Sequence, residues 1–484
     1  MRVINLLVPL LFGLVGILSF APFSIKILIF ISYSYLIFII LSETKDTFLK
    51  IFLWGIGHWG FGMSWIIVSV YYYGEASIAL SLLIFILLII ILSLIFTCPV
   101  YVIRKFIDIS NVRLSFHKSL LISAMLMMIE FSRYFLLNGV PWLIPGNIFL
   151  DTITQNIFSI LGVSATSLIF YILCCNLVLY WKNNFFYFAI FLIIFSLVPE
   201  NKIEKVNEGI KVSIIQPSSD PFLKYQEGYY NEIEKNIFSL INNVSDDTQL
   251  IVIPEAELPY PIQNNRFEVF INNLPNSQKV VMGAWHIEEN KLYNTIYNPK
   301  NDNLYKKTHL VPFGEYIPFI DNLRGLIAFF DLPMSNVSNG ERNQANIRIL
   351  NDYLVATPIC FDIAFPNTVR RMNKSSLFMI NISNDTWFGG SIGPHQHLEI
   401  ARIRSIENNK WTIRATNDGY SAIISNKGTI VYILDKGISS VLEGEVKLIN
   451  STSIYNKIGY LFPYIFTFFI IGLYLFISLW KKFK

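Results

Sequence analysis

The stretch Ala356-Thr357-Pro358-Ile359-Cys360-Phe361-Asp362 holds the one cysteine that lies outside the strongly apolar segments of this 484-residue chain. Cys98, Cys174 and Cys175 lie within apolar runs, where cysteine usually behaves as a small hydrophobic residue. The polar region contains no second thiol and no C-x-x-C motif, which excludes a disulfide framework there. We therefore interpret Cys360 as a candidate nucleophile.

The composition indicates that much of the chain lies in lipid. It is 53% hydrophobic and 15% charged, whereas charged residues make up about 25% of an average soluble domain. A soluble protein of this length could not bury so much apolar surface, so lipid must be part of its solvent. The net charge of +4 is small, and no basic run alternates with aromatic residues outside the apolar segments. Nucleic-acid binding is therefore disfavoured.

Eight apolar runs have nearly the length of about 20 residues that a helix needs to cross a bilayer. They cover about 3–21, 24–42, 48–72, 76–100, 117–137, 156–181, 184–199 and 458–480. The first could be a signal peptide, but Ser19-Phe20-Ala21 is a poor cleavage site and further apolar runs follow at once. We expect an uncleaved first span.

The positive charges predict the orientation of these spans. If the N-terminus is cytoplasmic, the inner loops and the C-terminal tail hold nearly all of the Lys and Arg residues that flank the spans, and Lys26 is the one exception. The inner positions are Lys45, Lys50, Arg104, Lys105, Arg113, Lys118, Lys182 and the Lys-rich tail. This asymmetry places both termini in the cytoplasm and the polar segment 200–457 on the outer side.

The polar segment alternates short β-rich runs with helical stretches, which is typical of an α/β domain. The helical stretches include Tyr229–Leu240 and Gln396–Asn408. The β-rich runs are Val212–Ile215, Leu250–Ile253, Val280–Gly283, Tyr353–Ala356 and Leu377–Ile380. We therefore predict three parts: a seven-span domain at 1–199, an α/β domain at 200–457, and a last span with a basic tail at 458–484.

Candidate reactive residues follow the predicted strands, where α/β folds usually place their sites. Glu255 comes just after one strand, Lys307 and Glu315 follow in the next polar phrase, and Cys360 follows a third strand. A cysteine thiol with a pKa of about 8.5 needs a base or a nearby cation to become a nucleophile. A carboxylate can take its proton, and an ammonium can stabilise the thiolate and a later oxyanion. Residue types alone leave this a hypothesis.

The spacing and the local phrases add a resemblance. Glu255, Lys307 and Cys360 lie 52 and 53 residues apart, and together they resemble the Glu-Lys-Cys triad of the nitrilase superfamily. Over nearly its full length the chain is similar to the apolipoprotein N-acyltransferase family. The phrases that carry this likeness are Leu310-Val311-Pro312-Phe313-Gly314-Glu315-Tyr316, Ser383-Asn384-Asp385-Thr386-Trp387-Phe388-Gly389, Gly393-Pro394-His395-Gln396-His397, Ser64-Trp65 and Gly139-Val140-Pro141-Trp142.

The resemblance implies roles for individual residues. Glu255 matches the family's general base, Cys360 its nucleophile, and Glu315 the additional glutamate that supports the triad. Lys307 matches the family's lysine, because it stands two residues before a histidine and eight before Glu315; its neighbour Lys306 is the competing choice.

Three positions depart from the family's usual residues, which puts their fine positioning in question. Asp362 stands where the family often has Glu, Phe361 replaces a common Tyr, and Tyr225 stands where Trp is frequent. Trp142 fits the family's membrane part, although Trp is common at bilayer interfaces in any case.

The resemblance also implies a fold and a reaction. The outer domain is expected to be an αββα nitrilase-like sandwich in the periplasm of a bacterium, attached to a multi-span inner-membrane domain. Cys360 would take an acyl chain from a membrane phospholipid, for which phosphatidylethanolamine is our choice, and hold it as a thioester. The acyl chain would then pass to the N-terminal amino group of a diacylglyceryl-cysteine apolipoprotein. No cofactor is expected.

Two other functional classes are weighed against this one. A membrane-anchored amidase could use the same triad on a small amide, but a single span would anchor it. A transporter or receptor with an outer domain would need no triad, and the few ionisable groups in the spans disfavour an ion pathway. The apolar arm Leu326–Phe330 is either a lid that dips into the bilayer surface or ordinary core.

Several polar residues have a structural alternative beside a functional one. His395 and His397 form only an H-x-H pair, so we expect packing or hydrogen bonding rather than a metal site. Glu130 and Arg133, three residues apart in a span, are expected to neutralise each other on one helix face. Asn384 is read either as part of the pocket near Cys360 or, like the Asp that follows it, as a turn former.

Overall fold

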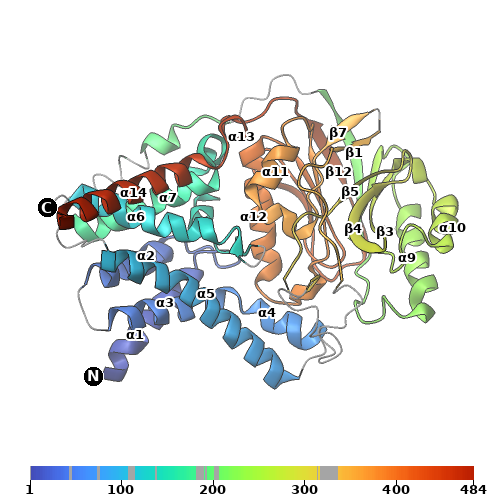
Figure 1. Ribbon diagram of the computed structural model, residues 1–484. Coiled ribbons are helices and arrows are strands. Elements are labelled where there is room, and N and C mark those ends of the chain that lie inside the picture. The colour runs from blue at the N-terminus through green and yellow to red at the C-terminus, as the bar shows by residue number, and fades with distance from the viewer. Residues whose placement is uncertain are drawn as a thin grey trace.

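The computed structural model describes residues 2–42, 46–73, 77–106, 115–136, 139–180, 190, 193–200, 207–312, 314–316, 336–350 and 352–483. Figure 1 shows a helical part, built mainly from the N-terminal segments, beside an α/β part. The helical part consists of α1 (Arg2–Ile17), α2 (Ile27–Leu41), α3 (Thr47–Gly62), α4 (Trp65–Val68), α5 (Ile78–Phe106), α6 (Ser115–Ser132), α7 (Phe158–Leu179) and the C-terminal α14 (Phe462–Phe483).

Helices are found at most of the positions predicted for spans, while half of the predicted run 184–199 lies outside the described residues. Within the described part of the chain, Ile78–Arg104 and Gln155–Leu179 are long and apolar enough to cross a membrane. Thr47–Gly62 and Trp65–Tyr71, bent by 53°, would make a third such segment if they act as one. The shorter apolar helices are Leu6–Ile17, Ile27–Leu41 and Phe462–Ile477.

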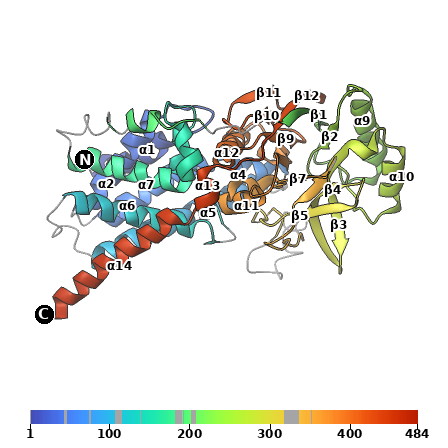
Figure 2. The ribbon, with the colours of Figure 1, turned by 90° about the horizontal axis from the view of Figure 1, so that it is seen from above.

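Apolar side chains cover the outer faces of several of these helices. Leu83 and Ile86 on α5, and Phe462, Ile465 and Phe469 on α14, are all exposed. Such large apolar side chains would be unfavourable in water, and they are typical of a surface that faces lipid. Figure 2 shows α14 extending away from the α/β part towards the C-terminus.

The α/β part contains two sheets that face each other. The first sheet has the order β12-β1-β2-β3-β4-β5, with bounds Ser440–Leu448, Asn207–Gln216, Leu250–Ile253, Val280–Glu288, Lys291–Asn298 and Asn303–Lys306. The second has the order β11-β10-β9-β8, with bounds Ile430–Leu434, Ser421–Ile424, Thr412–Thr416 and Met379–Ser383. A small hairpin pairs β6 (Ile347–Ile349) with β7 (Tyr353–Val355).

The alternation of side chains along the strands builds a four-layer αββα sandwich. On β1, Ile214 belongs to the apolar core shared with the second sheet, whereas Ile215 packs in a separate core with α9 (Tyr230–Asn242) and α10 (Asn265–Asn273). Successive strand residues point to opposite faces, so a strand covered on both sides reads as one continuous apolar run. Figure 1 shows α9 and α10 on the outer side of the first sheet.

The other outer layer joins the sandwich to the helical part. It contains α11 (Pro366–Met372) and α12 (Gly393–Asn408), and Figure 1 shows α12 between the second sheet and the membrane helices. Glu407 of α12 accepts the Val163 N–H of α7 at 2.7 Å, and Glu399 pairs with Lys26 at 3.3 Å. These links orient the α/β part on the helical part.

One glycine makes this junction possible. Gly162 interrupts α7 with a φ of 69°, a backbone conformation that favours glycine. A Cβ placed there would lie 2.2 Å from the ring of Tyr455, which belongs to α13 (Ile454–Ile458). The short linker helix can therefore pack against the kink in α7 only because position 162 has no side chain.

The predicted elements of the α/β part are confirmed. All five predicted β-rich runs overlap strands β1, β2, β3, β7 and β8, and the two predicted helices are α9 and α12. The strand expected before Lys307 is β5, whereas β4, β6, β9, β10, β11 and β12 were not predicted. Strands such as β4, β9 and β12 mix polar with apolar residues and so give little local signal, and each is stabilised by pairing with a distant or neighbouring strand.

Candidate active site

Glu255 lies two residues beyond the end of β2, in a tight turn. The next residue, Ala256, has a φ of 44°, and the turn passes so close to β3 that a Cβ on Gly283 would lie 2.5 Å from the Glu255 Cα. A side chain at position 283 would therefore displace this turn. The result is a buried carboxylate at the end of a central strand, as the sequence predicted.

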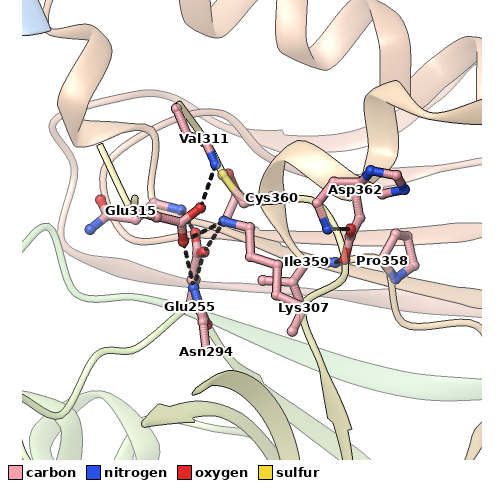
Figure 3. Close-up of polar contacts among 12 residues, drawn as sticks. Glu255, Asn294, Lys307, Val311, Glu315, Pro358, Ile359, Cys360 and Asp362 are labelled. Carbon is pink, nitrogen blue, oxygen red and sulfur yellow. Dashed lines mark hydrogen bonds and ion pairs between the residues drawn. The ribbon is translucent and has the colours of Figure 1, made fainter. Parts of the chain in front are cut away.

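Lys307 directly follows β5 and extends into the same space. Its backbone N–H donates to the carbonyl of Asn294 at 2.8 Å, which holds the backbone of Lys307 beside β4. Its Nζ donates to Glu255 Oε1 at 3.0 Å and to Glu315 Oε1 at 2.8 Å (Figure 3). The ammonium thus lies between two buried carboxylates. Lys306, the competing candidate, instead pairs with Glu288 and lies over the ring of Tyr293.

Asn294 and Val311 complete the frame around the two carboxylates. The side chain of Asn294 donates to Glu255 at 2.6 Å and to Glu315 at 3.2 Å, and the Val311 N–H donates to the second oxygen of Glu315 at 2.8 Å. Asn294 was not among the residues predicted from the sequence. The only sequence feature that could have indicated it is an amide side chain within a buried strand, because a buried amide needs hydrogen-bond partners.

Cys360 lies in a segment that runs along the edge of the second sheet. The segment after β7 runs beside β8, with Ile359 paired to Ile382 and the Pro358 carbonyl accepting from Asn381 at 2.9 Å. Cys360 then opens a 3-10 helix, Cys360–Ala364, with a φ of 45°. For a non-glycine residue this conformation costs about 1 kcal/mol or more. Figure 3 shows the Cys360 side chain reaching toward Lys307 and the two glutamates.

The electrostatics of the cluster keep the thiol protonated at rest. Burial raises the pKa of the Cys360 thiol, the charge of Glu255 raises it further, and Lys307 opposes both. Burial would lower the pKa of Lys307, but Cys360 and the two glutamates outweigh burial and hold that pKa well above its ordinary value. Lys307 therefore remains a cation, and Cys360 needs a neighbouring base to become a thiolate.

A buried polar network contacts the backbone of Cys360. His397 Nε2 lies 3.2 Å from the Cys360 carbonyl oxygen, and its Nδ1 lies 3.0 Å from Asp385. Arg414 donates to Asp385 at 2.6 Å and also contacts Asn381. The expected hydrogen-bonding role of His397 is confirmed, and Asp385 belongs to this network rather than to a turn alone.

The comparisons with known proteins agree with this geometry. Residues 12–176 match the family model described as the apolipoprotein N-acyltransferase N-terminal domain, and residues 211–454 match the carbon-nitrogen hydrolase model. An apolipoprotein N-acyltransferase of Haemophilus influenzae is 30% identical to the chain, over 94% of this chain and 91% of the relative. The chain belongs to the apolipoprotein N-acyltransferase family. The relative from Pasteurella multocida is 29% identical over 95% and 92% of the two chains, and that from Pseudomonas syringae is 30% identical over 89% and 88%.

Membership of this family covers both parts of the fold. The first matched region runs from Phe12 within α1 to Asn176 within α7, and the second contains Glu255, Lys307, Glu315 and Cys360. The resemblance to the apolipoprotein N-acyltransferase family and to the nitrilase superfamily is therefore confirmed.

Asp362, predicted to stand where the family often has Glu, anchors the loop that follows Cys360. Its carboxylate accepts from the His309 N–H at 2.7 Å, from the Ile359 N–H at 3.2 Å and from the Tyr305 hydroxyl at 3.1 Å. Burial raises the pKa of Asp362 to about 7, against the opposing effects of Lys307 and these donors. The shorter Asp side chain thus holds the loop that follows Cys360 against the segment that follows Lys307.

Asn384 and Tyr225 lie on the Glu255 side of the site. The Asn384 backbone N–H donates to Glu255 Oε2 at 2.7 Å, while its side chain accepts from the Thr386 N–H at 3.3 Å. Asn384 therefore both forms a turn and donates a backbone hydrogen bond to Glu255. Tyr225 packs in an apolar cluster with Ala256, the residue after Glu255, and with Trp285.

Phe361 and Trp142 form an aromatic contact between the α/β part and the helical part, beside Cys360. Their rings stack with centroids 6.4 Å apart, and the Trp142 indole N–H donates to Gln396 at 2.6 Å. Trp65 lies 5.6 Å from Trp142 and 4.8 Å from Phe388. Residues from the helical part and from the α/β part thus meet next to Cys360.

The expected pairing of Glu130 with Arg133 is wrong. Glu130 accepts from the hydroxyls of Tyr171 and Tyr464 at 3.2 and 3.1 Å, and these two described residues, Glu130 and Arg133, form no ion pair with each other. Arg133 instead donates to the backbone carbonyl of Trp142. The chain turns back after α6, so this carbonyl offers the guanidinium a nearer partner, and Arg133 holds the loop that carries Trp142.

Two features named in the sequence analysis cannot be compared with the structure. Phe313 of the Leu310–Tyr316 phrase and the apolar arm Leu326–Phe330 lie outside the described residues. Within the described part of the chain, no group of three His, Cys, Asp or Glu side chains gathers in a way that could hold a metal ion.

Proposed function

We propose that Cys360 carries an acyl chain from a membrane phospholipid to the N-terminal amino group of a lipid-modified cysteine in apolipoproteins. Family membership supports N-acylation of apolipoproteins rather than the hydrolysis of a small amide by a membrane-anchored amidase. The observation that carries the residue assignment is the Lys307 ammonium held between Glu255 and Glu315, with Cys360 directed at the same point (Figure 3).

In the first half-reaction, Glu255 takes the proton from the Cys360 thiol. The thiolate attacks the carbonyl carbon of the phospholipid ester, and Lys307 stabilises the oxyanion that forms. When this intermediate collapses, the ester C–O bond breaks and the lysophospholipid oxygen takes the proton from Glu255. Cys360 is left as a thioester, and Glu255 is again a carboxylate.

In the second half-reaction, the α-amino group of the apolipoprotein attacks the thioester carbonyl. Glu255 accepts a proton from the amine, the C–S bond breaks, and the Cys360 sulfur takes that proton back. The product is an amide, and the enzyme returns to its starting state. Because a thioester also reacts with water, the buried position of Glu255 and Lys307 and the aromatic wall of Phe361 and Trp142 favour transfer over hydrolysis.

Glu315, Asn294 and Asp362 are proposed as positioning residues. Glu315 and Asn294 hold Lys307 and Glu255 at hydrogen-bond distance. Asp362 ties the loop after Cys360 to His309, close to Lys307. Asn384 presents its backbone N–H to Glu255, and Tyr225 packs behind that residue.

The setting we propose is the inner membrane of a bacterium. Eight spans, with both termini in the cytoplasm, would place the α/β part in the periplasm, and the positive charges of the predicted inner loops support this orientation. The parts would be a seven-span domain at 1–199, the catalytic domain at 200–457 and a last span with its tail at 458–484. Phosphatidylethanolamine is the proposed acyl donor.

Intact-mass measurement of the purified protein tests this function. After incubation with phosphatidylethanolamine, the wild type should gain the mass of one acyl chain, and Cys360→Ala should gain none. Cys98→Ser removes an exposed cysteine on α5 and should keep the adduct. A wild type without an adduct, or a Cys360→Ala variant that N-acylates an apolipoprotein at the normal rate, would contradict the proposal.

A further inference from the structure

A cavity of about 180 Å³ lies at the junction between the α/β part and the membrane helices. None of its lining residues belongs to the Lys307 cluster of Glu255, Lys307, Glu315 and Cys360. Tyr134 comes from just after α6, Tyr460 from just before α14, and the remaining wall from α11 and neighbouring loops. The residues that define it are Tyr134, His309, Arg342, Phe365, Arg371 and Tyr460.

The charge of this cavity is positive. Among the described residues that line it, two are arginines and none is an aspartate or glutamate. Neither Arg342 nor Arg371 forms an ion pair within the described part of the chain. Arg371 donates to the Asn343 side chain at 2.8 Å, and its Nε is buried without a hydrogen-bond partner there. A buried guanidinium N–H without a partner is costly and indicates a missing acceptor.

His309 adds no charge to this wall. Burial lowers the pKa of His309 to about 3, and the nearby charges of Arg342 and Arg371 contribute to the shift. The ring therefore stays neutral, bonded through Nε2 to the Thr368 hydroxyl at 2.8 Å and stacked on Phe365 with centroids 3.6 Å apart. Two guanidinium groups beside neutral hydroxyl donors are the arrangement that proteins use for phosphate groups.

The surroundings of the cavity indicate that the phosphate belongs to a lipid. Phe135 on its rim and Leu461 and Phe462 next to Tyr460 are large apolar residues exposed on the outer surface. Tyrosines at the ends of apolar helices are typical of the level at which lipid headgroups lie. An anion bound by Arg342 and Arg371 would thus have apolar surface immediately beside it, as a phospholipid requires.

We propose that this cavity binds the phosphate of a phospholipid whose acyl chains lie along the start of α14, at a site distinct from the one at which Cys360 is acylated. The inference rests on the proposed membrane setting, but not on the catalytic assignment. The bound lipid would press on His309 and Phe365, and the His309 N–H holds Asp362 at 2.7 Å. Occupation of the cavity would therefore stiffen the loop that follows the nucleophile.

Lipid binding to the full-length Cys360→Ala protein, which cannot turn the lipid over, tests this proposal. Native mass spectrometry in detergent would compare retention of phosphatidylglycerol with that of a diacylglycerol of the same chains, which lacks the phosphate. We expect clear preference for phosphatidylglycerol, and an affinity about tenfold lower in Arg342→Gln/Arg371→Gln, because two charge-assisted hydrogen bonds are lost. Arg348→Gln, which removes an exposed arginine paired with Asp352, should bind as before.

Three outcomes would overturn the proposal. They are equal binding by the double variant, equal retention of the diacylglycerol, and displacement of the lipid by millimolar inorganic phosphate, which would assign the cavity to a soluble anion. Arg342 is exposed, so the single Arg342→Gln variant keeps the test valid if the double variant melts at a lower temperature. Because Cys360→Ala forms no acyl adduct, a negative result in this binding experiment says nothing about the role of Cys360, which the intact-mass measurement tests separately.

Discussion

His397 Nε2 lies 3.2 Å from the carbonyl oxygen of Cys360, while its Nδ1 contacts both Asp385 and Arg414. Burial and the charge of Arg414 lower the pKa of His397, against the effect of Asp385, so the ring is neutral at pH 7. The contact is to the backbone of the nucleophile rather than to its sulfur. His397 therefore acts on the position of Cys360, whose positive φ needs support from its surroundings.

We expect His397→Ala to slow acylation of Cys360 by about 10- to 100-fold, because a small displacement of a reacting group has effects of this size. Single-turnover formation of the adduct, followed by intact mass, measures the rate. His395→Ala is the matched control, since His395 contacts only the Tyr420 hydroxyl at 3.2 Å among the hydrogen bonds found for it. If both variants acylate at the wild-type rate, the contact with the Cys360 carbonyl has no positioning role.

The two glutamates beside Lys307 should differ in effect. Glu255→Gln removes the proton acceptor, and we expect adduct formation to fall by about 10³-fold. Glu315→Gln leaves Glu255 in place and removes only one partner of Lys307, so a fall of about tenfold is expected. Glu268→Gln, at an exposed position on α10, should have no effect. A larger loss in Glu315→Gln than in Glu255→Gln would reverse the two assignments.

The sequence predicted the residues that occur in recognisable phrases at strand ends. Glu255, Lys307 and Cys360 each follow a strand, and the α/β topology brings those strand ends together. Asn294 could not be found in this way. It lies in the middle of β4, and its contacts to Glu255 and Glu315 span 39 and 21 residues of sequence, so no local pattern marks it.

The prediction that failed in the helical part also depended on contacts between distant segments. Glu130 and Arg133 satisfy the helical spacing for an ion pair, but spacing ignores partners that arrive from elsewhere in the chain. The Tyr464 hydroxyl, from the C-terminal helix α14, donates to Glu130 at 3.1 Å, and Arg133 donates to the backbone carbonyl of Trp142. Local patterns thus predicted elements and strand-end residues, whereas contacts between distant segments required the folded chain.

Asp385 should stabilise the fold through charge. Burial alone would raise its pKa, but Arg414 and His397 outweigh burial and hold the pKa well below the ordinary 3.8. Removing one partner of a buried ion pair typically costs about 3–5 kcal/mol, so we expect Asp385→Asn to lower the melting temperature clearly at pH 7. Asp352→Asn, which breaks an exposed pair, is the control and should have little effect.

The pH dependence of that difference checks its cause. A carboxylate whose pKa is depressed by folding contributes stability that is complete above pH 3.8 and is lost as the pH falls below it. The difference in melting temperature between the wild type and Asp385→Asn should therefore stay constant from pH 7 to about pH 4 and narrow as the pH falls further below 3.8. A difference that does not narrow below pH 3.8 would mean that shape, and not the charge of Asp385, accounts for the loss.

Trp142 should link the membrane helices to the rate of catalysis. Its ring stacks on Phe361, next to the nucleophile, its indole N–H donates to Gln396, and its carbonyl is held by Arg133. Trp142→Ala removes both side-chain contacts, and we expect adduct formation to slow by about tenfold or more, since an aromatic pair and a buried hydrogen bond are lost together. Trp142→Phe keeps a ring against Phe361 and should recover part of this loss.

A comparison of the two substitutions separates the contributions. If Trp142→Phe is acylated as slowly as Trp142→Ala, the hydrogen bond to Gln396 is the important contact. If it is acylated at nearly the wild-type rate, the ring contact with Phe361 is the important one. Phe469→Ala removes an exposed aromatic residue of α14 and should acylate normally, because Phe469 faces outward. Wild-type rates in both Trp142 variants would show that the contact between Trp142 and Phe361 does not affect Cys360, and that the membrane part contributes to acylation by another route.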